Sequence, residues 1–204
     1  DGIRDIGVTG VQTCALPISL ALKEFYPSLA ELGSTSLRSG WKDLKVIEEY
    51  HQEPGHSIRV QSGAHQINDG LLRVLAVLAE IDSVHAPNDS TGGATSCVLF
   101  DEIENGINPE IVQRLVQVLL RGAKQTIVTT HSPLVLNYLP DEVAKEAVVL
   151  LFRDGFGSTR SVRLFDLPSA REKLAFLGPG EVYVDLDLES VTDEALNSLE
   201  DEDS

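Results

Sequence analysis

The sequence predicts an α/β fold in which a mainly parallel sheet is flanked by helices on both faces. Two short segments have the length and composition of buried strands, 97–100 with four apolar residues and 125–130 with Ile127 and Val128 at its centre, and a helical segment lies between them. Strand–helix–strand order is typical of parallel sheets, and wholly apolar strands are typical of sheets buried on both faces. With 204 residues, 42% of them hydrophobic, the chain has enough apolar side chains for one ordinary core.

Residues 1–19 are set aside because they have the character of a non-native segment. Residues 8–18 match the conceptual translation of a common sequencing-library adaptor over eleven consecutive positions. A basic start followed by an unbroken apolar stretch, as in a signal peptide, is absent. We therefore expect the natural chain to differ upstream of Leu20, which leaves Cys97 as the single native cysteine. With neither a disulfide framework nor an apolar run of roughly 18 residues, we expect a cytoplasmic protein with no membrane anchor.

Between Leu20 and the first apolar strand, the spacing of apolar and turn-forming residues predicts four elements. Pro27 interrupts a helical pattern, so the helix over 20–32 is expected to be short or kinked, and the Ser- and Gly-rich segment 33–40 is expected to be a loop. Alternating apolar and polar side chains predict two strands, 44–50 and 57–61, joined by a turn at Pro54-Gly55. A segment that is apolar on most faces predicts a buried helix over 70–81.

Turn and cap signals define the elements that follow. A Pro-, Gly- and Ser-containing loop is expected over 86–95. Asn108 and Pro109 are suited to the N-cap and first position of a helix that runs to Arg121, and Gly122 is suited to end it. The remaining expected elements are a short helix begun by Ser132-Pro133, a hairpin formed by 148–153 and 160–165, and a helix over 168–177.

The net charge of −16 is concentrated at the C-terminal end. Residues 181–204 contain ten acidic residues and no lysine or arginine. This composition predicts that 185–204 is an acidic, disordered tail, with an acidic docking segment as the alternative. A chain this acidic also argues against a broadly basic nucleic-acid-binding surface.

The strand over 97–100 runs directly into two carboxylates, Asp101 and Glu102. Such a pair at the end of a buried strand is costly unless a cation or a reacting group is bound there. One carboxylate could hold Mg²⁺ while the other acts as a general base toward water. The alternative is a strand that simply ends in a polar turn.

A second polar end occurs 29 residues later, where the strand over 125–130 is followed by His131. A lone histidine after a strand is more often structural than catalytic. Ligands of open α/β sheets, however, bind at the carboxyl ends of the strands, so Asp101, Glu102 and His131 could surround one phosphate.

Two segments in this order resemble the C-terminal half of the ABC-type ATPase core: Asp101-Glu-Ile-Glu-Asn-Gly-Ile-Asn-Pro109 and Thr130-His-Ser-Pro133. The branch they resemble is that of stand-alone bacterial AAA-family ATPases of the RecF/SMC-like kind. The resemblance implies that Asp101 is the Walker B aspartate that holds Mg²⁺. It also implies that Glu102 is the catalytic glutamate, that His131 senses the γ-phosphate of ATP, and that 104–109 is the D-loop.

Upstream, Ile67-Asn-Asp-Gly-Leu-Leu-Arg73 resembles the signature motif of this branch. The resemblance implies that Asn68, Asp69, Gly70 and Arg73 bind the nucleotide of a second subunit, as a homodimer that sandwiches ATP. Asn68 stands where the family usually has serine, whose hydroxyl contacts the γ-phosphate. A simple helix cap at Asn68 and an ion pair at Arg73 are the structural alternatives.

A Walker A loop is missing, because none of the sixteen glycines is followed by lysine. We therefore expect a partial P-loop NTPase whose N-terminal Walker A part is absent, with 20–184 as the C-terminal part of the ATPase core. The implied function is ATP binding and hydrolysis. The alternatives are a nucleotide-gated clamp that does not hydrolyse ATP and an inactive truncated chain. DNA, or a partner protein of a toxin or phage-defence system, is compatible with the family.

Overall fold

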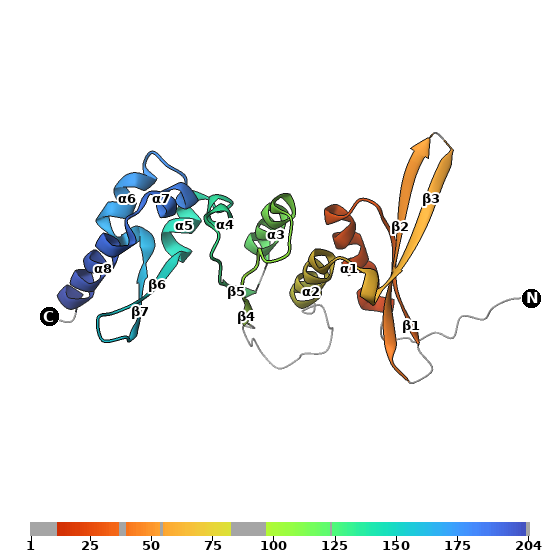
Figure 1. Ribbon diagram of the computed structural model, residues 1–204, viewed down its shortest axis with the longest axis horizontal. Helices are drawn as coiled ribbons and strands as arrows, with labels where there is room; N and C mark the ends of the chain where they lie inside the picture. The colour runs from red at the N-terminus through yellow and green to blue at the C-terminus, as the bar shows by residue number, and fades with distance from the viewer. Residues whose placement is uncertain (1–11, 37–39, 54, 83–96, 123, 203–204) are drawn as a thin grey trace, which may run out of the picture. The chain divides into compact units, whose positions relative to one another are not determined.

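The computed structural model describes residues 12–36, 40–53, 55–82, 97–122 and 124–202 (Figure 1). The chain forms two compact units, Asp1–Val128 and Thr129–Ser204, which are described separately below. The loop expected over 86–95 and the first eleven residues lie outside the described residues.

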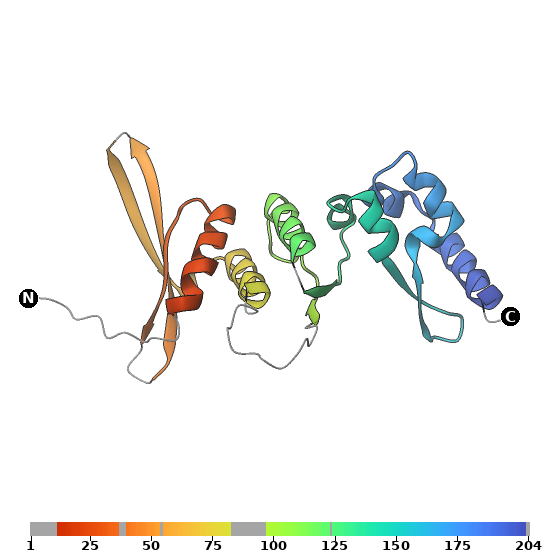
Figure 2. The same cartoon turned by 180° about the vertical axis from the view of Figure 1, so that it is seen from behind.

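Unit 1 begins with helix α1 (Gln12–Phe25) and a three-stranded antiparallel sheet in the order β1-β2-β3. The strands are β1 (Leu29–Ser36), β2 (Lys42–Glu53) and β3 (His56–Gly63). β2 and β3 confirm the two strands expected from alternation, and they form the long hairpin in Figures 1 and 2. The helix expected to be short or kinked over 20–32 is short: it ends at Phe25, before Pro27, and β1 then begins at Leu29 and pairs with β2.

The two apolar strands form a parallel pair, β4 (Cys97–Phe100) and β5 (Gln125–Val128), connected through helix α3 (Pro109–Arg121). Asn108 caps α3 as expected, because its Oδ1 accepts the Glu110 N–H at 3.0 Å. The expectation that the parallel strands β4 and β5 are buried on both faces was wrong. Leu99 is 63% exposed and its cross-strand partner Ile127 is 48% exposed. The expected mainly parallel sheet was also wrong, since this parallel sheet has two strands and the other two sheets are antiparallel.

The core of unit 1 is built mainly from helices. Helix α2 (Asp69–Asp82) confirms the buried helix expected over 70–81, and it packs against α1. Its buried side chains include Leu71, Val74 and Leu78, and those of α3 are Val112, Leu115 and Val116. Among the described residues, no helix has both the length and the apolar character that crossing a membrane requires.

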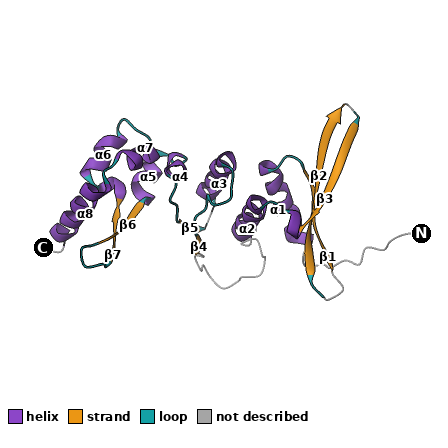
Figure 3. Cartoon of the chain, viewed as in Figure 1, coloured by secondary structure: helices purple, strands orange, loops and turns teal. Residues whose placement is uncertain are grey.

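Unit 2 is a group of helices around one hairpin (Figure 3). Its elements are α4 (Pro133–Asn137), α5 (Asp141–Ala147), β6 (Val149–Arg153), β7 (Thr159–Arg163), α6 (Pro168–Leu174), α7 (Pro179–Asp185) and α8 (Leu188–Glu202). The expected hairpin and the helix begun by Pro133 are confirmed. The expected disordered tail over 185–204 was wrong for α8, because Val191 and Ala195 are buried in the core of this unit.

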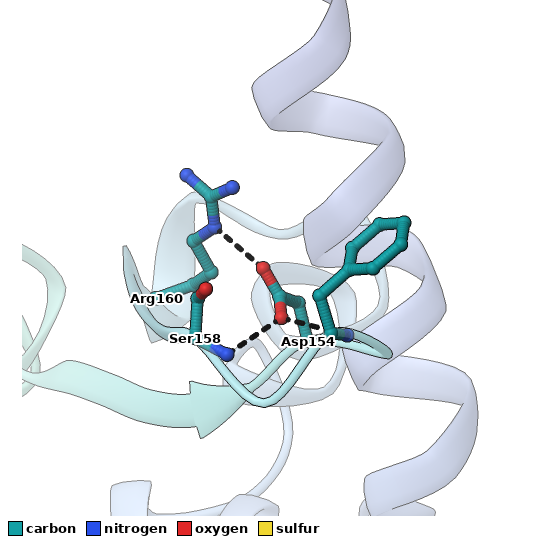
Figure 4. A network of polar contacts seen from close by, with 4 residues as sticks. Asp154, Ser158 and Arg160 are labelled. Atoms are coloured by element: carbon teal, nitrogen blue, oxygen red, sulfur yellow. Dashed lines mark hydrogen bonds and ion pairs between the residues drawn. The ribbon is translucent and has the colours of Figure 1, made fainter.

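The turn between β6 and β7 is organised by the buried carboxylate of Asp154 (Figure 4). Its Oδ1 accepts the backbone N–H groups of Ser158 at 2.8 Å and Phe156 at 3.0 Å, and its Oδ2 accepts Nε–H of Arg160 at 3.0 Å. The Ser158 hydrogen bond is the main reason that the pKa of Asp154 is lowered from its ordinary value, and Arg160 and Phe156 add to it.

Candidate functional site

The two carboxylates after β4 lie on a specialised turn. Glu102 adopts a left-handed backbone conformation with φ of 47°, the one positive φ at a non-glycine residue among those that the structure describes. This conformation is unfavourable for a residue with a Cβ atom, and such strain is concentrated at functional sites. Asp101 is exposed and Glu102 is half-buried. The chain therefore leaves β4 through a turn in which Glu102 has an unfavourable backbone conformation.

Two neighbouring residues hold Glu102 in this conformation. The backbone N–H of Asn105 donates to the Glu102 carbonyl oxygen at 3.0 Å, and the Asn105 side-chain Nδ2 donates to Glu102 Oε2 at 3.2 Å. Nη1 of Arg73, from helix α2, donates to the same carbonyl oxygen at 3.0 Å. Asn105 therefore restrains both the backbone and the carboxylate of Glu102, and Arg73 restrains the backbone.

The signature-like segment forms the start of α2. Asn68 caps the helix, because its Oδ1 accepts the Gly70 N–H at 2.7 Å and its carbonyl accepts the Leu72 N–H at 3.2 Å. Asn68 and Asp69 are exposed, whereas Gly70 is buried. The helix cap that the sequence analysis gave as the structural alternative is thus present. The cap uses the side-chain oxygen of Asn68, and the side-chain nitrogen can still donate a hydrogen bond.

Gly70 brings the start of α2 against the loop that follows Glu102. A Cβ atom added at Gly70 would lie 2.8 Å from the Gly106 carbonyl oxygen and 3.0 Å from Asn68 Oδ1. Gly106 itself has φ of 71°, which glycine adopts without strain. The close approach of the two backbone segments therefore requires glycine at position 70, whereas the positive φ favours glycine at position 106. The expected site residues of α2 and the carboxylate turn are brought together within unit 1.

His131 belongs to unit 2 and lies three residues after Val128, the last residue of β5 and of unit 1. It is exposed, and the next residue, Ser132, donates its backbone N–H to Thr130 Oγ1 at 3.0 Å, so a side chain stabilises the turn around the histidine. Helix α4 begins two residues later at Pro133. A pocket shared by His131 and the carboxylates of unit 1 stays a prediction.

The sequence analysis missed the roles of Asn105 and Gly106. The Asn-Gly pair three residues after a glutamate was a usable signal, because this dipeptide favours turns with positive φ. Two expectations about other residues were wrong. Free cysteine and tryptophan side chains are usually largely buried, but Cys97 is exposed and Trp41 is 72% exposed.

Comparisons with known proteins show which proteins the chain is similar to. Residues 48–137 match the family model described as "AAA domain, putative AbiEii toxin, Type IV TA system". A search of curated proteins found no match to the chain. A solved structure described as "Structural biochemistry of ATP-driven dimerization and DNA stimulated activation of SMC ATPases" is 13% identical, with a TM-score of 0.46 over 74% of this chain and 84% of that chain. The segment that carries the α2 start, the carboxylate turn and His131 is thus similar to an AAA-family ATPase domain.

Proposed function

We propose that this chain carries the signature, Walker B and switch-histidine part of an ATP-hydrolysing domain of the ABC-type head class. The observation that carries the proposal is the conformation of Glu102, which directly follows Asp101 and is held in a left-handed conformation by Asn105 and Arg73. The match of residues 48–137 to an AAA-domain model supports a nucleotide-binding, ATPase-type function.

In the proposed reaction Glu102 is the general base. It orients a water molecule and accepts a proton from it while the water oxygen bonds to the γ-phosphorus of ATP. The bond from that phosphorus to the β–γ bridging oxygen breaks, and ADP leaves with the electron pair. The Asn105 amide, 3.2 Å from Oε2, supports this role because it restrains the direction of the carboxylate. A general base of this kind contributes about 10²- to 10⁴-fold to the rate.

Asp101 is the proposed protein ligand of Mg²⁺. Among the described residues, no group of three or more His, Cys, Asp and Glu side chains could hold a metal ion. In nucleotide sites Mg²⁺ is held by one or two carboxylates together with water and phosphate oxygens. A single exposed carboxylate beside the base is therefore a suitable donor set. When bound, the ion would neutralise charge on the phosphates.

The remaining expected site residues are proposed to complete the site as the resemblance implies. His131 would contact the γ-phosphate, and the start of α2 would face ATP held by a second copy of the chain. The helix N-terminus favours an anion, and the amide nitrogen of Asn68 is the donor it offers in place of a serine hydroxyl. The intact protein would then act as a homodimer, with DNA or a toxin or defence protein as the partner on which it acts.

The test is ATP turnover by the protein with its natural upstream sequence in place, comparing wild type, Glu102→Gln and Glu110→Gln. Glu110 is an exposed carboxylate in the first turn of α3 and is the matched control. We expect Glu102→Gln to bind ATP and to lose at least about 100-fold in turnover, with Glu110→Gln unchanged. Equal turnover of Glu102→Gln and wild type would reject the general-base role. A wild-type protein that binds ATP without hydrolysing it would favour the nucleotide-gated clamp.

A further inference from the structure

Two contacts join the first turns of α2 to the turn that carries Glu102. Nη1 of Arg73 donates to the Glu102 carbonyl oxygen at 3.0 Å. One helical turn earlier, Gly70 lies so close to Gly106 that an added Cβ atom would approach the Gly106 carbonyl oxygen to 2.8 Å. The start of α2 thus contacts the turn over residues 102–106 at both of its ends, through Arg73 at Glu102 and through Gly70 at Gly106.

The Arg73 contact acts on the strained residue itself. Glu102 has φ of 47°, which a glutamate adopts only when surrounding contacts compensate for it. Its carbonyl oxygen accepts two hydrogen bonds, one from the Asn105 N–H of the same turn and one from Arg73. The first is local and forms with the turn, whereas the second comes from a helix 29 residues earlier. Arg73 therefore provides a tertiary restraint on the backbone of Glu102.

We propose that Arg73 is a positioning residue for Glu102: its hydrogen bond to the Glu102 carbonyl fixes the carboxylate turn to the start of α2. The inference rests on the proposed function, in which Glu102 is the base. It gives Arg73 a role within its own subunit, distinct from the phosphate contact that the sequence suggests. It also implies that a displacement of the α2 start, when that end meets a partner's nucleotide, moves the base of its own subunit.

A matched control lies in the same unit. Nη1 of Arg114, on α3, donates to the backbone carbonyl oxygen of Glu24 at 2.6 Å. Like Arg73, Arg114 is exposed and joins a helix to a distant carbonyl, but its acceptor lies on α1, outside the carboxylate turn. Arg73→Ala and Arg114→Ala each remove one hydrogen bond from an arginine to a backbone carbonyl. A difference between the two variants therefore reflects the loss of the bond to Glu102.

The first experiment measures amide hydrogen exchange in the 204-residue chain for Arg73→Ala, Arg73→Lys and Arg114→Ala. The Asn105 and Ile107 amides, which bond to the carbonyls of Glu102 and Glu104, report on the turn. We expect Arg73→Ala to increase their exchange about threefold to tenfold, Arg73→Lys to restore part of the protection because lysine can still donate, and Arg114→Ala to leave it unchanged. Unchanged exchange in Arg73→Ala, or an equal change in Arg114→Ala, would overturn the proposal.

The second experiment measures ATP turnover in the protein with its natural upstream sequence. We expect Arg73→Ala to lower kcat about tenfold with the KM for ATP within about twofold, and to cause no further loss when combined with Glu102→Gln, because both changes act through one group. A raised KM with kcat preserved, or a further loss in the double variant, would overturn the positioning role. If Glu102→Gln alone left turnover unchanged, the proposed function would fail, while the exchange result would still decide the Arg73 restraint.

Discussion

The backbone N–H of Gly180 donates to Oδ1 of Asn137 at 2.8 Å, and this bond joins the start of α7 to the end of α4. Gly180 has no room for a side chain, because an added Cβ atom would clash with the Pro133 carbonyl oxygen and lie 2.8 Å from Asn137. The helix that follows His131 is therefore packed directly on a glycine of α7.

Gly180→Ala should destabilise unit 2 by about 1–3 kcal/mol or more, because the added methyl group must separate α7 from α4. Chemical denaturation followed by circular dichroism measures the loss. Gly155→Ala is the control, since nothing lies within 4 Å of its added Cβ atom, and it should change stability by less than about 0.5 kcal/mol. Equal effects of the two substitutions would contradict this packing.

Asp154 should make the stability of the chain depend on pH in the acidic range. Its hydrogen bonds with Ser158, Arg160 and Phe156 lower its pKa in the folded state. A carboxylate with a lowered folded pKa stabilises the protein fully above the unfolded pKa of about 4, and this contribution is lost as the pH falls through the folded pKa. Urea unfolding between about pH 2 and 6 should show this loss in wild type and a smaller one in Asp154→Asn.

The matched control for Asp154 is Asp193, an exposed aspartate of α8. Asp193→Asn should keep the wild-type pH dependence. A pH profile of Asp154→Asn that superimposes on wild type would show that the turn gains nothing from the ionised carboxylate.

The open face of β4 and β5 should tolerate truncation in the 204-residue chain. Leu99→Ala should cost less than about 1 kcal/mol because its side chain is largely in solvent, whereas Leu115→Ala, at a fully buried position of α3, should cost about 2–5 kcal/mol. Similar costs at the two leucines in the 204-residue chain would contradict the open face.

The 204-residue chain by itself should show no rise in Tm with Mg²⁺-ATP. None of its glycines is followed by lysine, so the phosphate-binding loop that anchors the nucleotide is not present in it. Thermal melts with and without millimolar nucleotide measure this, and the protein with its natural upstream sequence should show a rise under the same conditions. A ligand-dependent rise of several degrees in the 204-residue chain would show that the residues described above bind nucleotide without that loop.

Elements with local signals could be predicted from the sequence, and elements decided by tertiary pairing could not. Asn108 and Pro109 begin α3 as their cap chemistry predicts. The strand β1 contains glycine and serines, which disfavour strands, and it forms because it pairs with β2 along its length. In α8 the acidic composition suggested disorder, but the four-residue spacing of Val191 and Ala195 places both in the core of unit 2.

In the candidate site, too, local patterns could be predicted from the sequence and tertiary contacts could not. Asp101 and Glu102 could be identified because two carboxylates after an apolar strand are an unusual local pattern. The bond from Arg73 to the Glu102 carbonyl could not be predicted, since it joins segments 29 residues apart. The sequence therefore predicts Asp101 and Glu102 as candidate site residues, but it does not predict the contact from Arg73 to Glu102.

The central proposal is that Asp101 and Glu102 act on one magnesium-bound triphosphate and that His131, as the family resemblance implies, contacts its γ-phosphate. The most direct measurement is a crystal structure of the protein with its natural upstream sequence, bound to Mg²⁺ and a non-hydrolysable ATP analogue. The account predicts Asp101 in the coordination sphere of the ion, directly or through water, Glu102 beside the water that faces the γ-phosphorus, and the His131 imidazole within hydrogen-bonding distance of the γ-phosphate. An imidazole remote from the nucleotide, or a nucleotide bound away from both carboxylates, would contradict it.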